Sequence, residues 1–531
     1  SSSSDVLARI GSSRRHPHGH VAMPIKRKDT SETEYIVVVD PMSTGATLAY
    51  HAQHHHGLRI ICVWSDACPA ELRGHSKHGV EYAGVVIHET GQIKATCAAI
   101  RKIAEPRDVF CGSEPGVECA DELSEALNLR GAGDPSMSET RRNKFLQSMA
   151  ARKAGLPVAA QKLAKTIEEV DQFLVTERET LHITGSFMAV VKPCDGAGSE
   201  GVTVCKSEEQ VRETFNSLQG TVNVLGRTNR EVLIMEYLAG DEYVVDTMSR
   251  DGVHKCVCIW KYIKFPLNGA ENVFYGQRLM AIDSEPHLAQ MVQYVIKVIT
   301  ALGIVNGAVH NEVKYNGETE AGRKRGAVMI ESNCRLHGAE GSWKPIAERC
   351  LGYSHVSAIL DAYDPEPDKF NALPKVPENL KAYGAQVGVR SVVEGTISHI
   401  KEDKVARIRM VDSYDSESLD WANQLAVGQK IEKTIDILTL CGQIQLVHKD
   451  KERLELDLAK VQEIIDDGLF VVEKGKTAKP RRRKVTGDLH ITPAVSPAAA
   501  ALEVWQPYLR GYAIAFGLGI AATMLLNARK R

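Results

Sequence analysis

Short apolar runs recur through the first third of the chain, separated by stretches of helical length such as 45–56. Runs rich in β-branched residues and bounded by turn residues are typical of buried strands, and they lie at 35–40, 58–64, 85–87 and 108–111. Strands that alternate with helices predict a parallel, doubly wound sheet. The first turn, 40–45 (DPMSTG), lacks the glycine spacing of a dinucleotide-binding loop. We therefore expect a Rossmann-like domain over 35–135 without a dinucleotide cofactor.

From residue 136 the alternation of parallel strands and helices gives way to hairpins and longer helices. The predicted helices lie at 141–154, 166–176, 207–218 and 285–302. The third begins with a capping box from Ser207 to Gln210. The predicted strands lie at 189–191, 232–237, 308–315 and 327–332, and a hairpin pairs 243–249 with 253–261. These elements define a second predicted domain over 136–378.

A proline-rich stretch after residue 364 leads to a third predicted domain over 379–473. Apolar runs there predict strands at 386–392, 395–401, 405–411 and 439–447. A helix at 456–467 and a last strand (LFVV) follow. We expect a small, β-rich α+β unit.

Both ends of the chain differ from the rest. Residues 1–34 are rich in Ser, Arg and His without hydrophobic periodicity, which indicates a disordered leader, with a targeting presequence as the alternative. A basic, Pro/Ala-rich linker, 474–504, precedes a candidate membrane anchor at 505–531. Its uncharged segment, 511–526, would be about 24 Å long as a helix, which is shorter than the bilayer core of about 30 Å. The alternative is therefore an apolar helix that docks on the protein itself. We expect cytoplasmic catalytic domains, held at a membrane if the tail inserts.

The composition is ordinary for a globular protein, with 43% hydrophobic and 25% charged residues among 531 and a net charge of −2. Nothing global therefore indicates a nucleic-acid partner. Twelve cysteines lack paired metal-ligand spacing, which favours reduced thiols. We interpret the histidines at 51, 54, 55 and 56 as a solvated helix end, because no acidic or cysteine partner lies near them in the sequence.

Candidate phosphate chemistry begins at 190–202 (VVKPCDGAGSEGV), where a strand reaches Lys192 and continues into a glycine-rich loop. Such a loop can turn several backbone N–H groups toward one anion, so a lysine before it suits a polyphosphate. Neither of the commonest phosphate-loop spacings is present. A surface hairpin with a structural lysine is the alternative at this point.

A second turn, 112–117 (GSEPGV), also follows a strand and opens a helix. A substrate group could bind at the start of that helix, and the alternative is that these residues simply form the turn.

Charged side chains fall on two predicted strands further along the chain. His310 and Glu312 lie on one face of the first, and Glu331, Asn333 and Arg335 share a face at the second. Two carboxylates and an amide oxygen are hard ligands that suit Mg²⁺, and an arginine beside them suits a phosphoryl group. Charges on buried strands are costly unless they are paired or metal-bound, so a metal–phosphate site accounts for the whole set.

With these motifs the chain resembles the ATP-grasp superfamily. The matching segments are 191–193 with DGAGSEGV, 236–238 with 240–242, 310–312 and 331–335, and the resemblance spans about 35–475. It is most similar to the carboxylate–amine ligases of the L-amino acid ligase and carnosine synthase group, through 40–45, 111–131, 141–145 and 395–448. The resemblance implies an α/β and α+β multidomain protein. In it an ATP-grasp fold is preceded by the Rossmann-like parallel α/β domain and followed by the small β-rich domain.

The resemblance also implies roles for individual residues. The ATP phosphates would be contacted by Lys144, Lys192, Gly196, Gly198, Ser199 and Gly201. The adenosine would lie beside Glu236, Tyr237, Leu238 and Glu242, and Mg²⁺ or Mn²⁺ would be held by Glu312, Glu331 and Asn333. Arg335 and Lys192 would be catalytic. The implied reaction joins a carboxylate to an amine, both expected to be amino acids, through an acyl phosphate, with release of ADP and phosphate.

Two features depart from the pattern of the superfamily. The first is the connection 316–326, which is long and polar and joins the two strands that carry the predicted metal ligands, 308–315 and 327–332 (the metal strands). The second follows Arg335, where the chain has Leu336, His337 and Gly338 and many relatives have other residues. The acceptor side of the pocket is therefore left unassigned. The alternatives are an ATP-grasp enzyme of different chemistry, such as a carboxylase or nucleotide-biosynthesis ligase, and a membrane-tethered nucleotide-binding protein with little turnover. A homodimer is left open.

Overall fold

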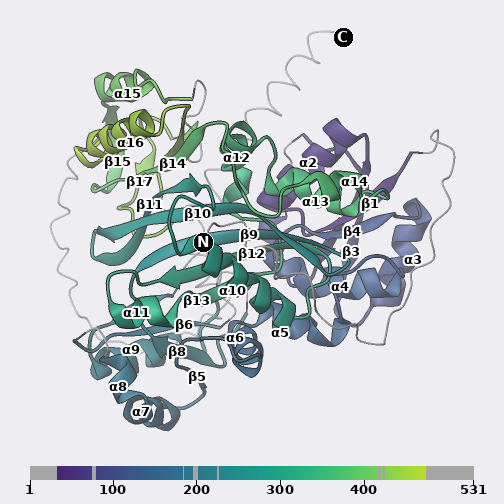
Figure 1. Ribbon diagram of the computed structural model, residues 1–531, viewed down its shortest axis with the longest axis horizontal. Helices are drawn as coiled ribbons and strands as arrows, with labels where there is room; N and C mark the ends of the chain where they lie inside the picture. Colours follow the sequence, from purple (N-terminus) through teal and green to yellow (C-terminus); the bar gives the residue numbers. More distant parts are fainter. Residues whose placement is uncertain are drawn as a thin grey trace, which may run out of the picture.

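The computed structural model describes residues 33–73, 79–182, 185–194, 201–223, 227–415, 420–421 and 425–473 (Figure 1). The predicted linker and membrane anchor lie outside these residues, as do residues 1–32 of the predicted leader and Gly196, Gly198 and Ser199 of the glycine loop. Among the described helices, none is long and apolar enough to cross a bilayer. All twelve cysteines fall within the described ranges and are free thiols, as predicted.

The predicted parallel sheet is confirmed at the start of the chain. Its four strands, in the order β3-β2-β1-β4, are β1 (Tyr35–Val39), β2 (Arg59–Ser65), β3 (Tyr82–His88) and β4 (Asp108–Cys111). All three pairings are parallel. The connecting helices are α2 (Thr44–His56), α3 (Ile93–Ile103) and α4 (Val117–Ala126). Helix α2 ends at His54, His55 and His56, which are exposed, so the solvated helix end is confirmed.

A second, antiparallel sheet carries Lys192. Its order is β5-β8-β6-β7, with β5 (Gln161–Ala164), β6 (Ala189–Pro193), β7 (Thr203–Cys205) and β8 (Val232–Glu236). Helices α7 (Ile167–Thr176), α8 (Arg178–Leu181) and α9 (Glu208–Leu218) accompany it, and residues of all three share one core cluster with the strands. The Ser207 hydroxyl caps α9 as predicted, but the Gln210 side chain accepts from the Lys206 N–H rather than from the N-cap residue.

The central element is an eight-stranded sheet in the order β13-β12-β9-β10-β11-β14-β18-β16. Strands β9 (Asp241–Arg250) and β10 (Val253–Leu267) form the predicted hairpin, and β11 (Ala270–Met280) follows. Strand β12 (Gly307–Tyr315) lies between β9 and the edge strand β13 (Val328–Asn333) and pairs antiparallel with both. Helix α10 (Leu288–Ala301) packs on the sheet, and α11 (Glu320–Arg325) lies within the long connection between β12 and β13.

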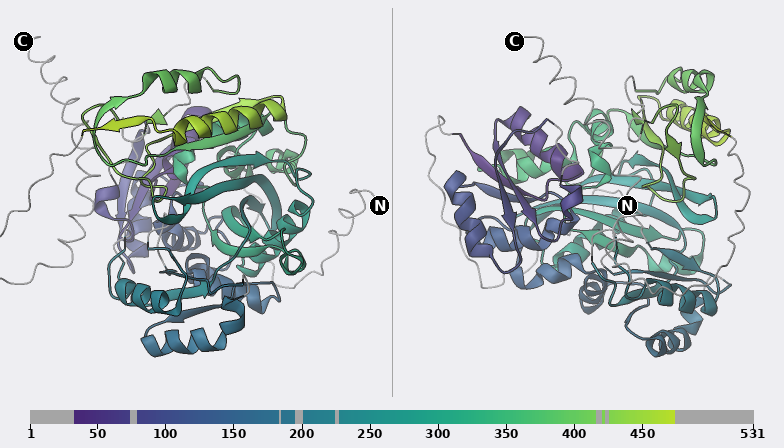
Figure 2. Two further views of the ribbon diagram at one scale, coloured as in Figure 1. Left: turned by 90° about the vertical axis from the view of Figure 1, so that its left-hand side faces the viewer. Right: turned by 180° about the vertical axis from the view of Figure 1, so that it is seen from behind.

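A third group of elements extends the other end of this sheet. Strands β14 (Tyr383–Val389), β16 (Asp420–Trp421) and β18 (Gly442–His448) belong to the large sheet itself. Strands β15 (Gly395–Ile400), β17 (Lys430–Ile431) and β19 (Phe470–Val472) form a small sheet, next to α15 (Glu402–Arg409) and α16 (Lys451–Asp466). Helices α15 and α16 lie at the opposite end of the molecule from the first sheet (Figures 1 and 2).

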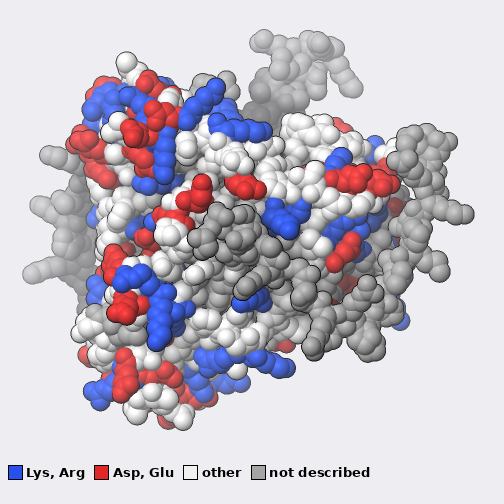
Figure 3. Space-filling model, viewed as in Figure 1, with Lys and Arg blue, Asp and Glu red and all other residues white. Residues whose placement is uncertain are grey.

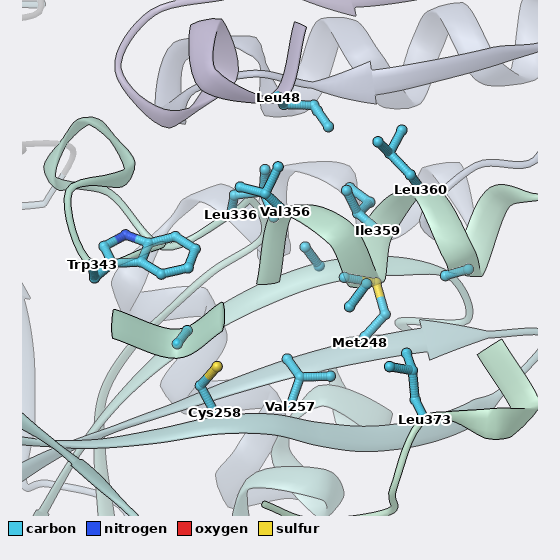
Figure 4. Packing of buried hydrophobic residues seen from close by; sticks show 14 of the residues in the cluster. Leu48, Met248, Val257, Cys258, Leu336, Trp343, Val356, Ile359, Leu360 and Leu373 are labelled. Atoms are coloured by element: carbon cyan, nitrogen blue, oxygen red, sulfur yellow. The ribbon is translucent and has the colours of Figure 1, made fainter. Parts of the chain in front are cut away.

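The first sheet is joined to the large sheet through one apolar cluster. Helices α12 (Lys344–Leu351), α13 (His355–Tyr363) and α14 (Asp368–Ala372) take part in it. In Figure 4, Val356 and Ile359 of α13 lie between Leu48 of α2 and Met248 and Val257 of the sheet. Over the face seen in Figure 3 acidic and basic side chains are interspersed, in keeping with the net charge of −2.

Two predicted elements are wrong. Residues 405–409 belong to helix α15 and the predicted strand at 405–411 does not form, because Val405 and Ile408 are buried one helical turn apart and acids begin the helix while arginines end it. The predicted helix at 141–154 is two helices, α5 (Ser138–Arg142) and α6 (Lys144–Lys153). Asn143 breaks it with an extended backbone and caps α6 by accepting from the N–H groups of Phe145 and Leu146.

Candidate active site

The pairing of β12 with β13 brings the predicted metal ligands together. Glu312 lies opposite Glu331, and His310 lies opposite Asn333. Directly paired residues share one face of a sheet, so all four side chains project to the same side. The Asn333 amide donates to Glu331 Oε1 at 3.0 Å. Two carboxylates set side by side repel each other unless cations lie near them, which makes this oxygen set suitable for a divalent metal ion.

Two lysines predicted to contact phosphate approach the same carboxylates. Lys144 Nζ, at the start of α6, lies 2.9 Å from Glu331 Oε2. Lys192 is buried on β6, and burial lowers its pKa while the charges of Glu331 and Glu312 oppose that effect. Burial alone would raise the pKa of Glu331, but Lys144 and Lys192 outweigh it and hold this pKa well below its usual range. Glu331 therefore remains ionised between two cations.

Arg335 lies beside the metal strands and faces the first sheet. Its Nε donates to Glu114 Oε2 at 2.9 Å, and its Nη1 donates to the Leu336 carbonyl at 2.8 Å. Arg142 also approaches Glu114, with Nη1 at 3.1 Å from Oε1. Glu114 belongs to the turn after β4, so the first sheet supplies a carboxylate to the site. Sequence reasoning marked that turn but missed Glu114, which lies 221 residues from Arg335.

The acids predicted to lie near adenosine are engaged with other cations. Glu236, at the end of β8, lies 2.5 Å from Arg325 Nη1, and its other oxygen accepts from the Ala160 N–H. Arg325 comes from α11, so the long connection between the metal strands closes over this end of the site. Glu242 accepts from Lys264 Nζ at 2.6 Å. Sequence reasoning also missed Lys264, because nothing in β10 marks which of its lysines faces the carboxylates.

The remaining predicted adenosine residues flank this region. Leu238 is buried, and Tyr237 is half-buried with a pKa raised by that burial. Gly201, the described end of the glycine loop, has φ of +67°, and a side chain there would meet the Pro193 ring at 3.0 Å. Only glycine fits both conditions at this position.

Next to the predicted metal ligands, on the same face of the sheet, lies a buried hydrogen-bond network centred on Asp246 of β9, which is paired with His310. Its Oδ1 lies 2.9 Å from His310 Nδ1, and its Oδ2 lies 2.9 Å from His337 Nδ1. The Trp260 indole donates to Oδ2 at 3.1 Å. Among the described residues, Asp246, His310 and His337 are close enough together to hold a metal ion. Both oxygens of Asp246 already accept hydrogen bonds, however, so we interpret the group as a network that supports its neighbours.

His310 connects this network to the metal ligands. Its Nε2 lies 3.2 Å from Glu312 Oε1, so each ring nitrogen faces a carboxylate. Burial would lower the pKa of His310, but Asp246 and Glu312 together raise it to about 9. A charged imidazole between two carboxylates fixes the orientation of Glu312.

One segment of this fold, which carries most of the charged site, matches a known domain family. Residues 186–340 match the family model of the ATP-grasp domain. The chain therefore contains an ATP-grasp domain, which includes the metal strands, Lys192 and Arg335. The predicted ATP-grasp fold, preceded by a parallel α/β domain, is confirmed.

Over 438 residues the chain is 26% identical to dapdiamide A synthase of Enterobacter agglomerans, covering 82% of this chain and 96% of that protein. Among solved structures, L-amino acid ligase from Bacillus licheniformis has a TM-score of 0.61 at 18% identity, covering 84% of this chain and 100% of that one. The ADP complex of an N5-carboxyaminoimidazole ribonucleotide synthetase has a TM-score of 0.55 at 17% identity. The match covers 82% of this chain and 97% of that one. The likenesses to solved structures concern the fold.

Proposed function

We propose that this chain is an ATP-dependent carboxylate–amine ligase that forms an amide and that both of its substrates are amino acids. The observation that carries the proposal is the pairing of Glu312 with Glu331 on adjacent strands, with Lys144 at 2.9 Å from Glu331 and Arg335 beside them. The similarity to dapdiamide A synthase, over most of both chains, supports this reaction class.

The residues present fit a divalent metal. Glu312, Glu331 and Asn333 would hold Mg²⁺ or Mn²⁺, because they offer hard oxygen ligands on one face of the sheet. When bound, the metal supplies positive charge that neutralises the triphosphate. Lys144 and Lys192 would bind the phosphates from the other side.

In the first step a carboxylate oxygen of one substrate attacks the γ-phosphorus in line, and the bond between that phosphorus and the β,γ-bridging oxygen breaks. The products of this step are an acyl phosphate and ADP. The amine of the second substrate then attacks the acyl carbon, the bond from carbon to the phosphate oxygen breaks, and phosphate leaves. Arg335 stabilises the oxyanion of the tetrahedral intermediate, for which its Nη2 has no partner among the described residues.

The decisive experiment is a coupled ADP-release assay with amino acids supplied singly and in pairs. The proposal expects ADP release with one or more pairs, in equal amount to the amide identified by mass spectrometry. Turnover that requires bicarbonate and yields no amide would replace the proposal with a carboxylase. ATP binding without turnover over the full set of pairs would favour the nucleotide-binding alternative.

A further inference from the structure

The loop after Arg335 has a backbone that cannot hold its shape alone. Ala339 and Glu340 both have φ of +55°, a region that side chains other than glycine rarely adopt. Such conformations persist only where the surrounding structure imposes them. The Trp343 indole and His355 also bond this loop, and two further groups of contacts come from the large sheet and from the first sheet.

The contact from the large sheet is made by Asp246, which is fully buried. One of its oxygens receives His337 Nδ1 and the other receives His310 Nδ1, each at 2.9 Å. The pKa of Asp246 is held below its usual range by these histidines against the effect of burial, so both oxygens act as acceptors. A single carboxylate therefore connects the loop of Arg335 to the strand of Glu312.

The contacts from the first sheet are made by the turn that opens α2. Thr44 Oγ1 donates to the His337 carbonyl at 2.6 Å and lies 2.9 Å from the Gly338 carbonyl. Ser43 Oγ accepts from the Glu340 N–H at 3.0 Å, and Thr47 Oγ1 donates to the Glu340 carbonyl at 2.9 Å. Ser43 itself has φ of +51°. This is the motif at 40–45 to which the proposed function assigns no role.

We propose that Asp246 and Thr44 are positioning residues. Asp246 holds the side chain of His337 and Thr44 holds its carbonyl, and together they fix the position of Arg335 relative to Glu312. The inference rests on the proposed function, because it gives Arg335 its role in amide formation. The first sheet then contributes to catalysis by orienting a residue of the ATP-grasp domain. The hydrogen bonds of Asp246 and Thr44 reach His310, Trp260 and the 337–338 loop, and not Arg335 or Glu312 themselves.

The test uses the full-length protein with Thr44→Val, which keeps the shape of the side chain and removes the donor to the His337 carbonyl. A misplacement of a catalytic group costs about tenfold to a hundredfold in rate, so kcat for amide formation should fall by about that factor. KM for ATP should stay within about twofold, because the lysines and metal ligands are untouched. Thr44→Ser retains the hydroxyl and should restore most of kcat.

Thr96→Val is the matched control. Thr96 is a buried threonine of α3, another helix that packs on the first sheet, and its hydroxyl bonds His88 and the Gln92 carbonyl and not the loop after Arg335. It should leave kcat unchanged. If Thr44→Val keeps full kcat, or if Thr96→Val loses as much, the positioning role is wrong.

Asp246→Asn is the second variant, because an amide can accept from only one of the two imidazole donors. It should lower kcat at least as much as Thr44→Val, again with KM for ATP little changed. If the folded variant keeps full kcat, the role of Asp246 is wrong. Arg335→Ala distinguishes a failure of the proposed function from a failure of the positioning role. If it retains amide formation the proposed function fails, whereas its loss together with a fully active Thr44→Val overturns the positioning role alone.

Discussion

Glu331→Gln tests the metal assignment most directly. The substitution keeps the shape of the side chain and removes the charge that lies 2.9 Å from Lys144 Nζ. Removing one partner of a buried ion pair costs about 3–5 kcal/mol. The side chains of Lys144 and Glu331 keep 11% and 18% of their exposure, and glutamine still offers an oxygen to Lys144, so we expect about 2 kcal/mol here. The midpoint of thermal unfolding without ligands should fall accordingly.

The response to nucleotide should change in the opposite direction. In the wild type, ATP must displace Glu331 from Lys144, whereas in the variant this ion pair is already lost. ATP without metal should therefore raise the unfolding midpoint of Glu331→Gln more than that of the wild type. Turnover with Mg²⁺ should fall at least about 100-fold, because a metal ligand is lost.

Glu271→Gln is the control for this experiment. Its salt bridge with Lys206 measures 2.6 Å but is exposed, with side-chain exposures of 39% and 58%. Its loss should change stability by less than about 1 kcal/mol and leave turnover intact. Turnover of Glu331→Gln within twofold of the wild type would refute the metal assignment, and an unchanged midpoint would refute the charge balance on which it rests.

Three further variants test other parts of the site. Arg335→Ala should leave ATP affinity within about twofold, measured by calorimetry, and lower amide formation about 100-fold to 1,000-fold, because it removes one donor to the oxyanion. His310 has a folded pKa of about 9 against an ordinary value of 6.5, so its stabilising contribution is complete below about pH 6.5 and is lost as the pH rises through 9. The unfolding midpoint of the wild type should therefore fall more between pH 6.5 and 9.5 than that of His310→Gln. Arg325→Ala leaves Glu236 buried without its cation, so the unfolding midpoint should fall, as followed by scanning calorimetry.

The sequence predicted those parts of the fold in which pattern and structure agree locally. Apolar β-branched runs marked β1, β2 and β4, and residues spaced two apart marked the metal face of β12 and β13. The break at Asn143 was missed, because a cationic helical pattern runs on through it and only the cap geometry ends α5 there. Residues 405–411 (VARIRMV) alternate apolar and basic positions over 406–410 as a strand would, and seven residues are too short a run to separate a strand period from a helical one without knowing what covers them.

The missed site residues share one cause, which is that tertiary pairing brings them to the site. Asp246 reaches His310 because β9 pairs with β12 across 64 residues of chain. Glu114 reaches Arg335 because the first sheet docks beside the large one. Neither residue carries a local signal, whereas Lys192 precedes a glycine-rich loop and could be found from sequence.

The pairs within the site explain how so many charges are held in one place before any ligand binds. Lys144 pairs with Glu331, Arg335 with Glu114, and Lys264 with Glu242. In two of these pairs a cation assigned to phosphate or to the intermediate is neutralised by a carboxylate of the same site. A metal ion alone would compete with Lys144 for Glu331, and a triphosphate alone would compete with Glu331 for Lys144. The two together replace the broken pair with two new ones, since the metal takes the carboxylate and the phosphate takes the lysine. Under the proposed function, the same side chains would therefore hold one another in place and would favour joint binding of nucleotide and metal, which is the arrangement that phosphoryl transfer requires.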